Sequence, residues 1–253
     1  MKYSAIFFLS SITILLMFYG CDKFKGKDGQ DGISAPILTG DLIGYVYLYD
    51  DNSGNRLVDN GGILVTVEGE NMVTTTSSDG RWIFTGLATG TYTIAFSKAD
   101  YGTKKAVGLQ FVGGGQVFYG SEQLYKIPSF TLTGLSAIAS VSQVTIAGNL
   151  TGLLPKQIGV MLFFGTTSSV TADPKDYIVE ANVLGFADGQ TTFSGFMTGA
   201  WFYKNGFNAG QIVYVVAYSV SSPSNRYLDI ATGKYYYTGI NPTPSNVVSV
   251  VVP

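Results

Sequence analysis

Hydrophobic and polar residues alternate with a period of two over much of this chain, which is the pattern of half-buried β-strands. In residues 41–50, for example, Val46 and Leu48 fall on one face and a row of tyrosines falls on the other. Turn-forming clusters such as Ser78-Asp79-Gly80 separate such segments at intervals of roughly 8–12 residues. We therefore predict an all-β chain built from two tandem antiparallel β-sandwiches.

The strand-like segments divide into two groups around Pro128, where a short Lys-Ile-Pro hinge interrupts the alternation. We predict one sandwich in residues 37–128 and a second in residues 129–253. The run at residues 159–164 (GVMLFF) is apolar throughout, which predicts a strand that is buried on both faces. The expected strands of the first group are 41–50, 62–68, 73–76, 81–85, 92–96, 105–112 and 116–119, and those of the second group are 130–133, 144–148, 159–164, 177–183, 191–196, 211–220, 235–238 and 246–252.

The N-terminal segment has the features of a targeting signal. Lys2 precedes an uncharged apolar stretch at residues 5–18, which as a helix would span only about 21 Å, less than the ~30 Å of a bilayer core. This length favours a signal peptide over residues 1–20. The segment that follows, residues 21–36, is polar and glycine-rich and is predicted to be a flexible tether.

Gly20-Cys21 directly follows the apolar stretch, and Cys21 is the only cysteine of the chain. This arrangement resembles the lipobox of bacterial lipoproteins, although Phe18 and Tyr19 stand where a leucine and a small residue are usual. The resemblance implies cleavage before Cys21 and attachment of acyl chains to its sulfur. The alternative is an ordinary signal peptide or an uncleaved anchor in which the cysteine has no role.

Residues 40–113 carry a second resemblance. Asp79-Gly80-Arg81-Trp82-Ile83-Phe84, followed by Leu87-Ala88-Thr89-Gly90-Thr91-Tyr92, looks like the carboxypeptidase regulatory-like domain. That family implies a prealbumin-like sandwich without peptidase activity. Two connections depart from its pattern, because residues 57–60 replace a Pro-Leu pair and Tyr101-Gly102 reverses a Gly-aromatic pair.

Residues 129–253 resemble the fibronectin type III-like domains of bacterial surface proteins. The resemblance lies in Gly165-Thr166-Thr167, in the strand at residues 211–220 and in the terminal strand at residues 246–252. The corner tyrosine of that family falls at Val213, so it is either absent or supplied by Tyr214. An immunoglobulin-like sandwich is expected in both cases.

The amino-acid composition excludes most classes of catalytic and metal sites. The chain has no histidine and one cysteine, which excludes His-based triads, His-ligated zinc and CxxC redox chemistry. With 15 Lys+Arg against 17 Asp+Glu, it also lacks the positive field that nucleic-acid binding requires. Asp50, Asp51, Ser53 and Asn55 could approach a cation, but we interpret them as an Asx-rich turn. We predict no catalytic residue, no metal and no cofactor.

Aromatic side chains are the better binding candidates. Tyr45, Tyr47 and Tyr49 form an outward row, spaced about 6.6 Å apart along the strand, that could stack on sugar rings or contact a protein partner. The alternative is that a neighbouring domain or a sheet edge covers them. Residues 201–203 (WFY) and 235–237 (YYY) could form a second aromatic surface on loops.

Together these features predict a non-enzymatic lipoprotein of the cell envelope. Lipidated Cys21 would hold it at the outer membrane, on either the periplasmic or the surface face, and its sandwiches would serve binding, adhesion or scaffolding. The partner would be an envelope protein or a glycan. The alternative function is that of a carbohydrate-binding accessory lipoprotein.

Overall fold

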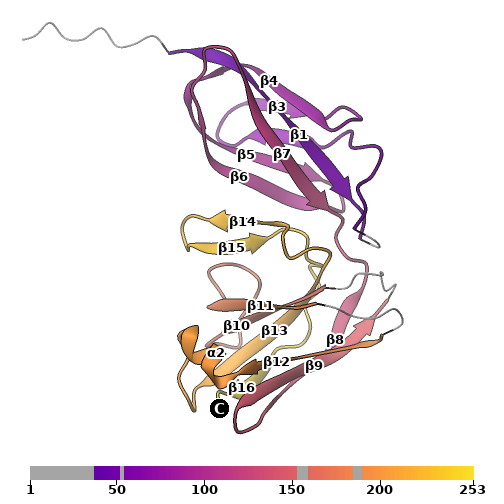
Figure 1. The fold of residues 1–253 in the computed structure, drawn as a ribbon, viewed down its shortest axis with the longest axis vertical. Coiled ribbons are helices and arrows are strands. Elements are labelled where there is room, and N and C mark those ends of the chain that lie inside the picture. The colour runs from indigo at the N-terminus through magenta and orange to yellow at the C-terminus, as the bar shows by residue number, and fades with distance from the viewer. Residues whose placement is uncertain (1–36, 52–53, 153–158, 185–189) are drawn as a thin grey trace, which may run out of the picture. The chain divides into compact units, whose positions relative to one another are not determined.

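Strands make up most of the structure, a computed structural model that describes residues 37–51, 54–152, 159–184 and 190–253. The predicted all-β sandwich class is confirmed (Figure 1). The predicted signal peptide, Cys21 and the tether up to Pro36 lie outside the described residues.

The first sandwich packs a three-stranded sheet, in the order β4-β1-β7, against a four-stranded sheet, in the order β3-β2-β5-β6. β1 is the central strand of its sheet, so both of its edges are hydrogen-bonded. The bounds are β1 (Thr39–Tyr49), β2 (Leu64–Val67), β3 (Met72–Thr75), β4 (Arg81–Ala88), β5 (Gly90–Lys98), β6 (Gly102–Phe111) and β7 (Gln116–Tyr125).

One strand pair departs from the antiparallel pattern. β1 and β7 run parallel, with Tyr45 opposite Ser121 and Tyr49 opposite Tyr125. Period-two alternation is the same in parallel and antiparallel strands, so it could not distinguish the two arrangements. The register of this pair shifts once, between Ile43 and Gly44, where β7 carries an additional residue.

The core of the first sandwich is formed by the inward positions of the alternating strands. Val46 and Leu48 of β1 are buried, as are Trp82 and Phe84 of β4, whose rings lie 5.6 Å apart. Burial of each such side chain stabilises the fold by roughly 1.5–3 kcal/mol. Because neighbouring residues in a strand point to opposite faces, this burial sends Tyr45, Tyr47 and Tyr49 outward.

The second sandwich packs the sheet β12-β9-β8 against the sheet β11-β10-β13-β16, and a separate hairpin joins β14 to β15 (Figure 1). The bounds are β8 (Thr131–Ala139), β9 (Gln143–Thr151), β10 (Gly159–Gly165), β11 (Val179–Leu184), β12 (Thr192–Thr198), β13 (Ile212–Val220), β14 (Arg226–Asp229), β15 (Lys234–Tyr237) and β16 (Val248–Val251).

A short helix, α2 (Gly199–Lys204), stands where we predicted an aromatic loop. Thr198 begins it, because the Thr198 hydroxyl oxygen accepts a hydrogen bond from the Trp201 amide at 3.2 Å. Phe202 is fully buried and Trp201 packs against the same core. Within the described ranges, no helix combines the length and the apolar character needed to cross a membrane.

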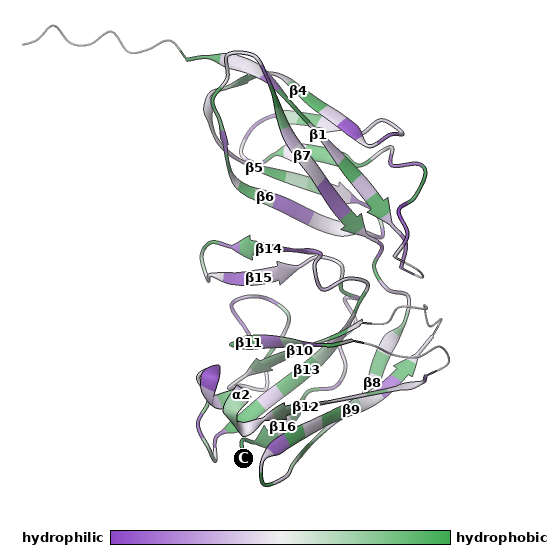
Figure 2. Ribbon diagram, in the orientation of Figure 1, coloured by the Kyte–Doolittle hydropathy of each residue, from purple (hydrophilic) through white to green (hydrophobic). Residues whose placement is uncertain are grey.

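β10 is buried on both faces, as the apolar run at residues 159–164 predicts, and so is β13 from Val215 to Val220. Figure 2 shows the hydropathy of the residues along both strands. Their inner face belongs to the main core of the second sandwich. Phe163 projects from the outer face into a second cluster, where its ring lies 5.1 Å from that of Tyr177 and 5.6 Å from that of Tyr237. Tyr237 is therefore a core residue, as is Phe202, and both segments, residues 201–203 and 235–237, lie in regular elements rather than on loops. The predicted second aromatic surface is wrong for these two residues, whereas Tyr203, Tyr235 and Tyr236 are exposed.

Candidate functional site

The outward face of β1 and β7 gathers five aromatic side chains, which we name the aromatic face: Tyr45, Tyr47, Tyr49, Phe118 and Tyr125. The three tyrosines of β1 point outward as predicted and are each partly exposed. The rings of Tyr45 and Tyr47 are stacked, with their centroids 6.0 Å apart. That these tyrosines bind a ligand stays a prediction.

β7 extends the row of tyrosines sideways. The Phe118 ring meets Tyr45 edge-on at 6.1 Å, and Tyr125 stacks on Tyr49 at 4.8 Å. Phe118 is 64% exposed, an unusual position for a large apolar ring. We did not predict these two residues, because their place beside β1 depends on the parallel pairing of strands that are distant in the sequence.

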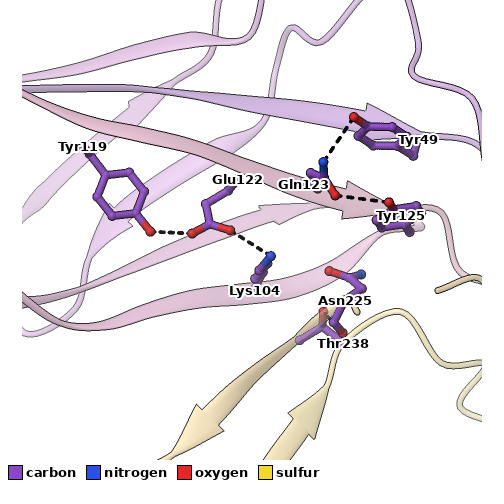
Figure 3. Close-up of polar contacts among 8 residues, drawn as sticks. All are labelled: Tyr49, Lys104, Tyr119, Glu122, Gln123, Tyr125, Asn225 and Thr238. Atoms are coloured by element: carbon purple, nitrogen blue, oxygen red, sulfur yellow. Dashed lines mark hydrogen bonds and ion pairs between the residues drawn. The ribbon is translucent and has the colours of Figure 1, made fainter. Parts of the chain in front are cut away.

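Polar groups fix one end of the aromatic face (Figure 3). The Gln123 amide nitrogen donates to the Tyr49 hydroxyl at 3.3 Å, and the Tyr125 hydroxyl donates to the Gln123 amide oxygen at 3.1 Å. A tyrosine hydroxyl is already neutral at physiological pH, and burial raises the pKa of Tyr125 further, so this group is able to donate. The two stacked rings are thus held in place before any ligand arrives.

Arg56 lies over the middle of the row. Its guanidinium carbon is 3.5 Å from the centre of the Tyr47 ring, which is a close cation–π contact. The backbone of Arg56 forms an isolated antiparallel bridge with Tyr49, so the chain returns beside β1 at Arg56. Arg81, the first residue of β4, is opposite Tyr45 in the same sheet.

Asn60 holds residues 56–60, which we name the returning segment, against β1. It is fully buried, and its amide oxygen accepts a hydrogen bond from the Leu48 amide at 2.8 Å. Its amide nitrogen donates to the Leu57 carbonyl at 3.2 Å, and its backbone amide donates to the Ser78 carbonyl at 2.8 Å. A buried side chain with these partners positions the segment that carries Arg56.

The opposite side of β7 carries an ion pair that does not belong to the aromatic face (Figure 3). Lys104 Nζ lies 2.8 Å from Glu122 Oε2, and the Tyr119 hydroxyl donates to the other carboxylate oxygen. Burial, followed by the hydrogen bond to Glu122, raises the pKa of Tyr119 above its ordinary value. Glu122 is opposite Val46, an inward residue, so we assign this cluster a structural role.

Asp50 and Asn55, which follow the end of β1, are hydrogen-bonded to each other. The Asp50 amide donates to the Asn55 carbonyl at 3.0 Å, and the Asn55 amide donates to Asp50 Oδ1 at 3.3 Å. Ser53, which belongs to the same predicted turn, lies outside the described residues. Across the part of the chain that the structure describes, no three acidic or other metal-ligating side chains are grouped closely enough to hold a metal ion.

Comparison with known proteins finds likeness in structure only. No protein-family model and no curated protein sequence matches the chain, so the carboxypeptidase regulatory-like and fibronectin-like resemblances are not confirmed.

Among solved structures, a DUF3823 family protein from Parabacteroides merdae is 14% identical, with a TM-score of 0.31, and the match covers 85% of this chain and 100% of that one. A DUF3823 family protein from Bacteroides ovatus is 11% identical, with a TM-score of 0.32 and the same coverage. A provisionally named carbohydrate-binding protein from Bacteroides uniformis is 11% identical, with a TM-score of 0.30, and the match covers 85% of this chain and 99% of that one. Likeness at this level carries no functional conclusion for this chain.

Proposed function

We propose that this chain is a lipoprotein of the cell envelope that is anchored through Cys21 at the outer membrane and acts by binding rather than by catalysis. In this proposal the first sandwich is a carboxypeptidase regulatory-like module and the second is a fibronectin-like one. The aromatic face is the binding surface, and carbohydrate is the class of ligand. Binding of a glycan by an anchored protein would serve adhesion or scaffolding in the envelope.

The observation that carries the proposal is the exposed, ordered row of rings on the aromatic face. Phe118 is 64% exposed, whereas Phe163, at an outward position of a central strand in the second sandwich, is fully buried by other parts of the chain. Large apolar rings that remain exposed on a rigid sheet are typical of binding surfaces.

Sugars suit this surface because they present an apolar C–H face together with a rim of hydroxyl groups. Phe118 offers an open ring for stacking, and Tyr45 lies beside it. Gln123 and the hydroxyl groups of Tyr49 and Tyr125 offer donors and acceptors at the far end of the row. This combination of apolar surface and a few placed polar groups is what small-molecule and glycan recognition requires.

A glycan array with the full-length chain in detergent micelles tests this function. We expect binding to at least one class of polysaccharide, and we expect Phe118→Ala and Tyr47→Ala to weaken it by about tenfold each, the loss of roughly 1.4 kcal/mol. The matched control is Tyr203→Ala, which removes a side chain that is 49% exposed on the second sandwich and should leave binding unchanged. If the unaltered chain bound no glycan, the carbohydrate assignment would be wrong and a protein partner would take its place.

Metabolic labelling with radioactive palmitate tests the anchor separately. The chain should take up label and sediment with the outer membrane, because several acyl chains give firm attachment. Cys21→Ser should remove both the label and the sedimentation. An unaltered chain that is recovered without label from the soluble fraction would contradict the anchor but not the binding surface.

A further inference from the structure

Two arginines lie on the same flank of the aromatic face, opposite the flank that β7 occupies. From them we propose that the aromatic face selects acidic polysaccharides, whose carboxylate or sulfate groups pair with Arg56 and Arg81. This inference rests on the proposed function, because it names which carbohydrates the same surface takes.

The placement of the arginines follows from the pairing of β1. Arg81 of β4 is opposite Tyr45, and its neighbour Trp82 is buried, so the Arg81 side chain points outward with the tyrosines. β4 begins at Arg81, so its pairing with β1 ends at Tyr45. Past that point the returning segment pairs with β1 and sets Arg56 opposite Tyr49. The two positions are thus four residues of β1 apart, which corresponds to about 13 Å along the strand. A polymer with repeated acidic groups can pair with both guanidinium groups.

Both guanidinium groups keep their charge available. In the described residues, each ion pair within 4.0 Å is made by a lysine: Lys104–Glu122, Lys105–Glu68, Lys126–Asp51 and Lys175–Asp173. Because neither Arg56 nor Arg81 is among these pairs, an acidic ligand would not have to displace a bound carboxylate.

The carboxylate nearest to Arg81 in sequence is engaged within its own turn. Asp79 Oδ1 accepts hydrogen bonds from the Ser77 hydroxyl at 2.6 Å and from the backbone amide of Arg81 at 3.1 Å. Asp41, the acidic residue of β1, accepts a hydrogen bond from the Gly86 amide near the opposite end of the strand. Glu122 of β7 faces the other side of the sheet. Of the carboxylates near Arg56 in sequence, Asp50 accepts a hydrogen bond from the Asn55 amide, Asp59 accepts one from the Gly61 amide, and Asp51 lies 3.9 Å from Lys126. The Ser77 hydrogen bond lowers the pKa of the Asp79 carboxyl, and Arg81 adds to this electrostatically but makes no ion pair with Asp79.

The contact with Tyr47 prepares Arg56 for an anion. A guanidinium group that stacks on a ring is held in one plane and keeps its N–H edges free to make two parallel hydrogen bonds to a carboxylate or a sulfate. Arg56 is exposed, so those edges face solvent. An acidic sugar could then place its charged group at an arginine and its ring against an aromatic side chain at the same time.

Matched pairs of polymers test the selection. Binding of the full-length chain in micelles is measured to polygalacturonate and to its neutral methyl ester, and to dextran sulfate and to uncharged dextran. We expect at least one acidic member to bind about tenfold more tightly than its neutral partner, and added salt to reduce the difference. The two pairs distinguish carboxylate from sulfate as the preferred group.

Single substitutions test the roles of the two arginines. Arg56→Gln and Arg81→Gln should each weaken acidic-polymer binding by about tenfold and should change binding to the neutral partner polymer by a much smaller factor. Lys175→Gln, which removes an exposed charge from the second sandwich, should have no effect. Thermal midpoints of all variants establish that they fold.

Three results would overturn the inference: equal binding of acidic and neutral partners, full binding by both arginine variants, or equally tight binding of a single-stranded oligonucleotide. In the first of these cases neutral glycan binding would still stand, so the proposed function would survive. A failure to bind any glycan would instead remove the proposed function itself.

Discussion

The outward face of the central strands is buried in the second sandwich and partly exposed in the first. In the second sandwich, the outward side chains of β10 and β13 meet Tyr177 and Tyr237, which come from other parts of the chain, and form a second buried cluster. In the first sandwich, the outward tyrosines of β1 remain partly exposed, and Phe118 beside them is 64% exposed.

The difference lies in what surrounds the rings rather than in the type of residue. Around Phe163, the tyrosine hydroxyls have partners from the same sandwich: Tyr177 donates to the Tyr235 carbonyl at 2.7 Å, and Tyr237 donates to Glu180 at 3.0 Å. These bonds satisfy polar groups that would otherwise be costly to bury. On the aromatic face, where the rings stay exposed, the tyrosine hydroxyls can instead make such hydrogen bonds with a ligand.

Truncation of one phenylalanine in each sandwich should show the largest difference in stability between the two regions. Phe163→Ala removes a fully buried ring that contacts three tyrosines, and we expect it to reduce the free energy of unfolding by about 3–5 kcal/mol. Phe118→Ala removes an exposed ring and should cost less than about 1 kcal/mol. Denaturant unfolding of both variants measures the difference. Equal losses would show that the aromatic face is a core rather than a binding surface.

Substitution of a glycine beside the aromatic face should lower the free energy of unfolding nearly as much. Gly80 has φ +89°, and a methyl group there would lie 2.3 Å from the Val46 carbonyl oxygen and 3.3 Å from the Tyr47 ring. We expect Gly80→Ala to cost about 2 kcal/mol or more in the free energy of unfolding. Gly206 is the matched control, because it has φ +87° with no atom in the way, so Gly206→Ala should cost only the backbone strain. If both variants lost the same stability, the close approach of Gly80 to β1 would be wrong.

Removal of the buried amide that supports Arg56 should have a moderate effect. Asn60→Ala leaves the Leu48 amide without its acceptor, and we expect a loss of about 1–3 kcal/mol in the free energy of unfolding. The exposed neighbour Asp59 makes one local bond, to the Gly61 amide, so Asp59→Ala should cost less. Thermal unfolding compares the two variants, and a larger loss for Asp59→Ala would contradict the assigned role of Asn60.

The sequence predicted those parts of the aromatic face that depend on a single strand. Period-two alternation sufficed to place Val46 and Leu48 inside and the tyrosines of β1 outside, because the direction of each side chain follows from its neighbours. The apolar run of β10 likewise predicted burial on both faces.

The remaining residues of the face depend on contacts between distant segments. Phe118 and Tyr125 reach it through parallel pairing with β1, and Arg56 reaches it because its backbone forms a bridge with Tyr49. Alternation within one strand contains no information about which strands become neighbours. The helix α2 was missed for a related reason, because its aromatic residues favour strands and the packing of Phe202 into the core outweighs that preference.

Alkaline titration should reveal the buried cluster of the second sandwich through an effect that appears only at high pH. Burial raises the pKa of Tyr237 to about 12, and the adjacent Glu180 carboxylate acts in the same direction, while Arg226 opposes them. In the unfolded chain the same group titrates near pH 10, so the folded state holds its proton more tightly between these values. The stabilisation is complete below pH 10 and is lost as the pH rises towards 12.

Tyr237→Phe should therefore flatten the decline in the free energy of unfolding between pH 10 and pH 12. The variant also loses the hydrogen bonds of Tyr237 to Glu180 and Arg226, so its stability at pH 7 must be measured as the reference. Only the change in slope reports the buried hydroxyl, because the lost hydrogen bonds lower stability at both pH values. An unchanged slope would mean that water reaches Tyr237, and the second sandwich would then leave its outward rings as open as the first.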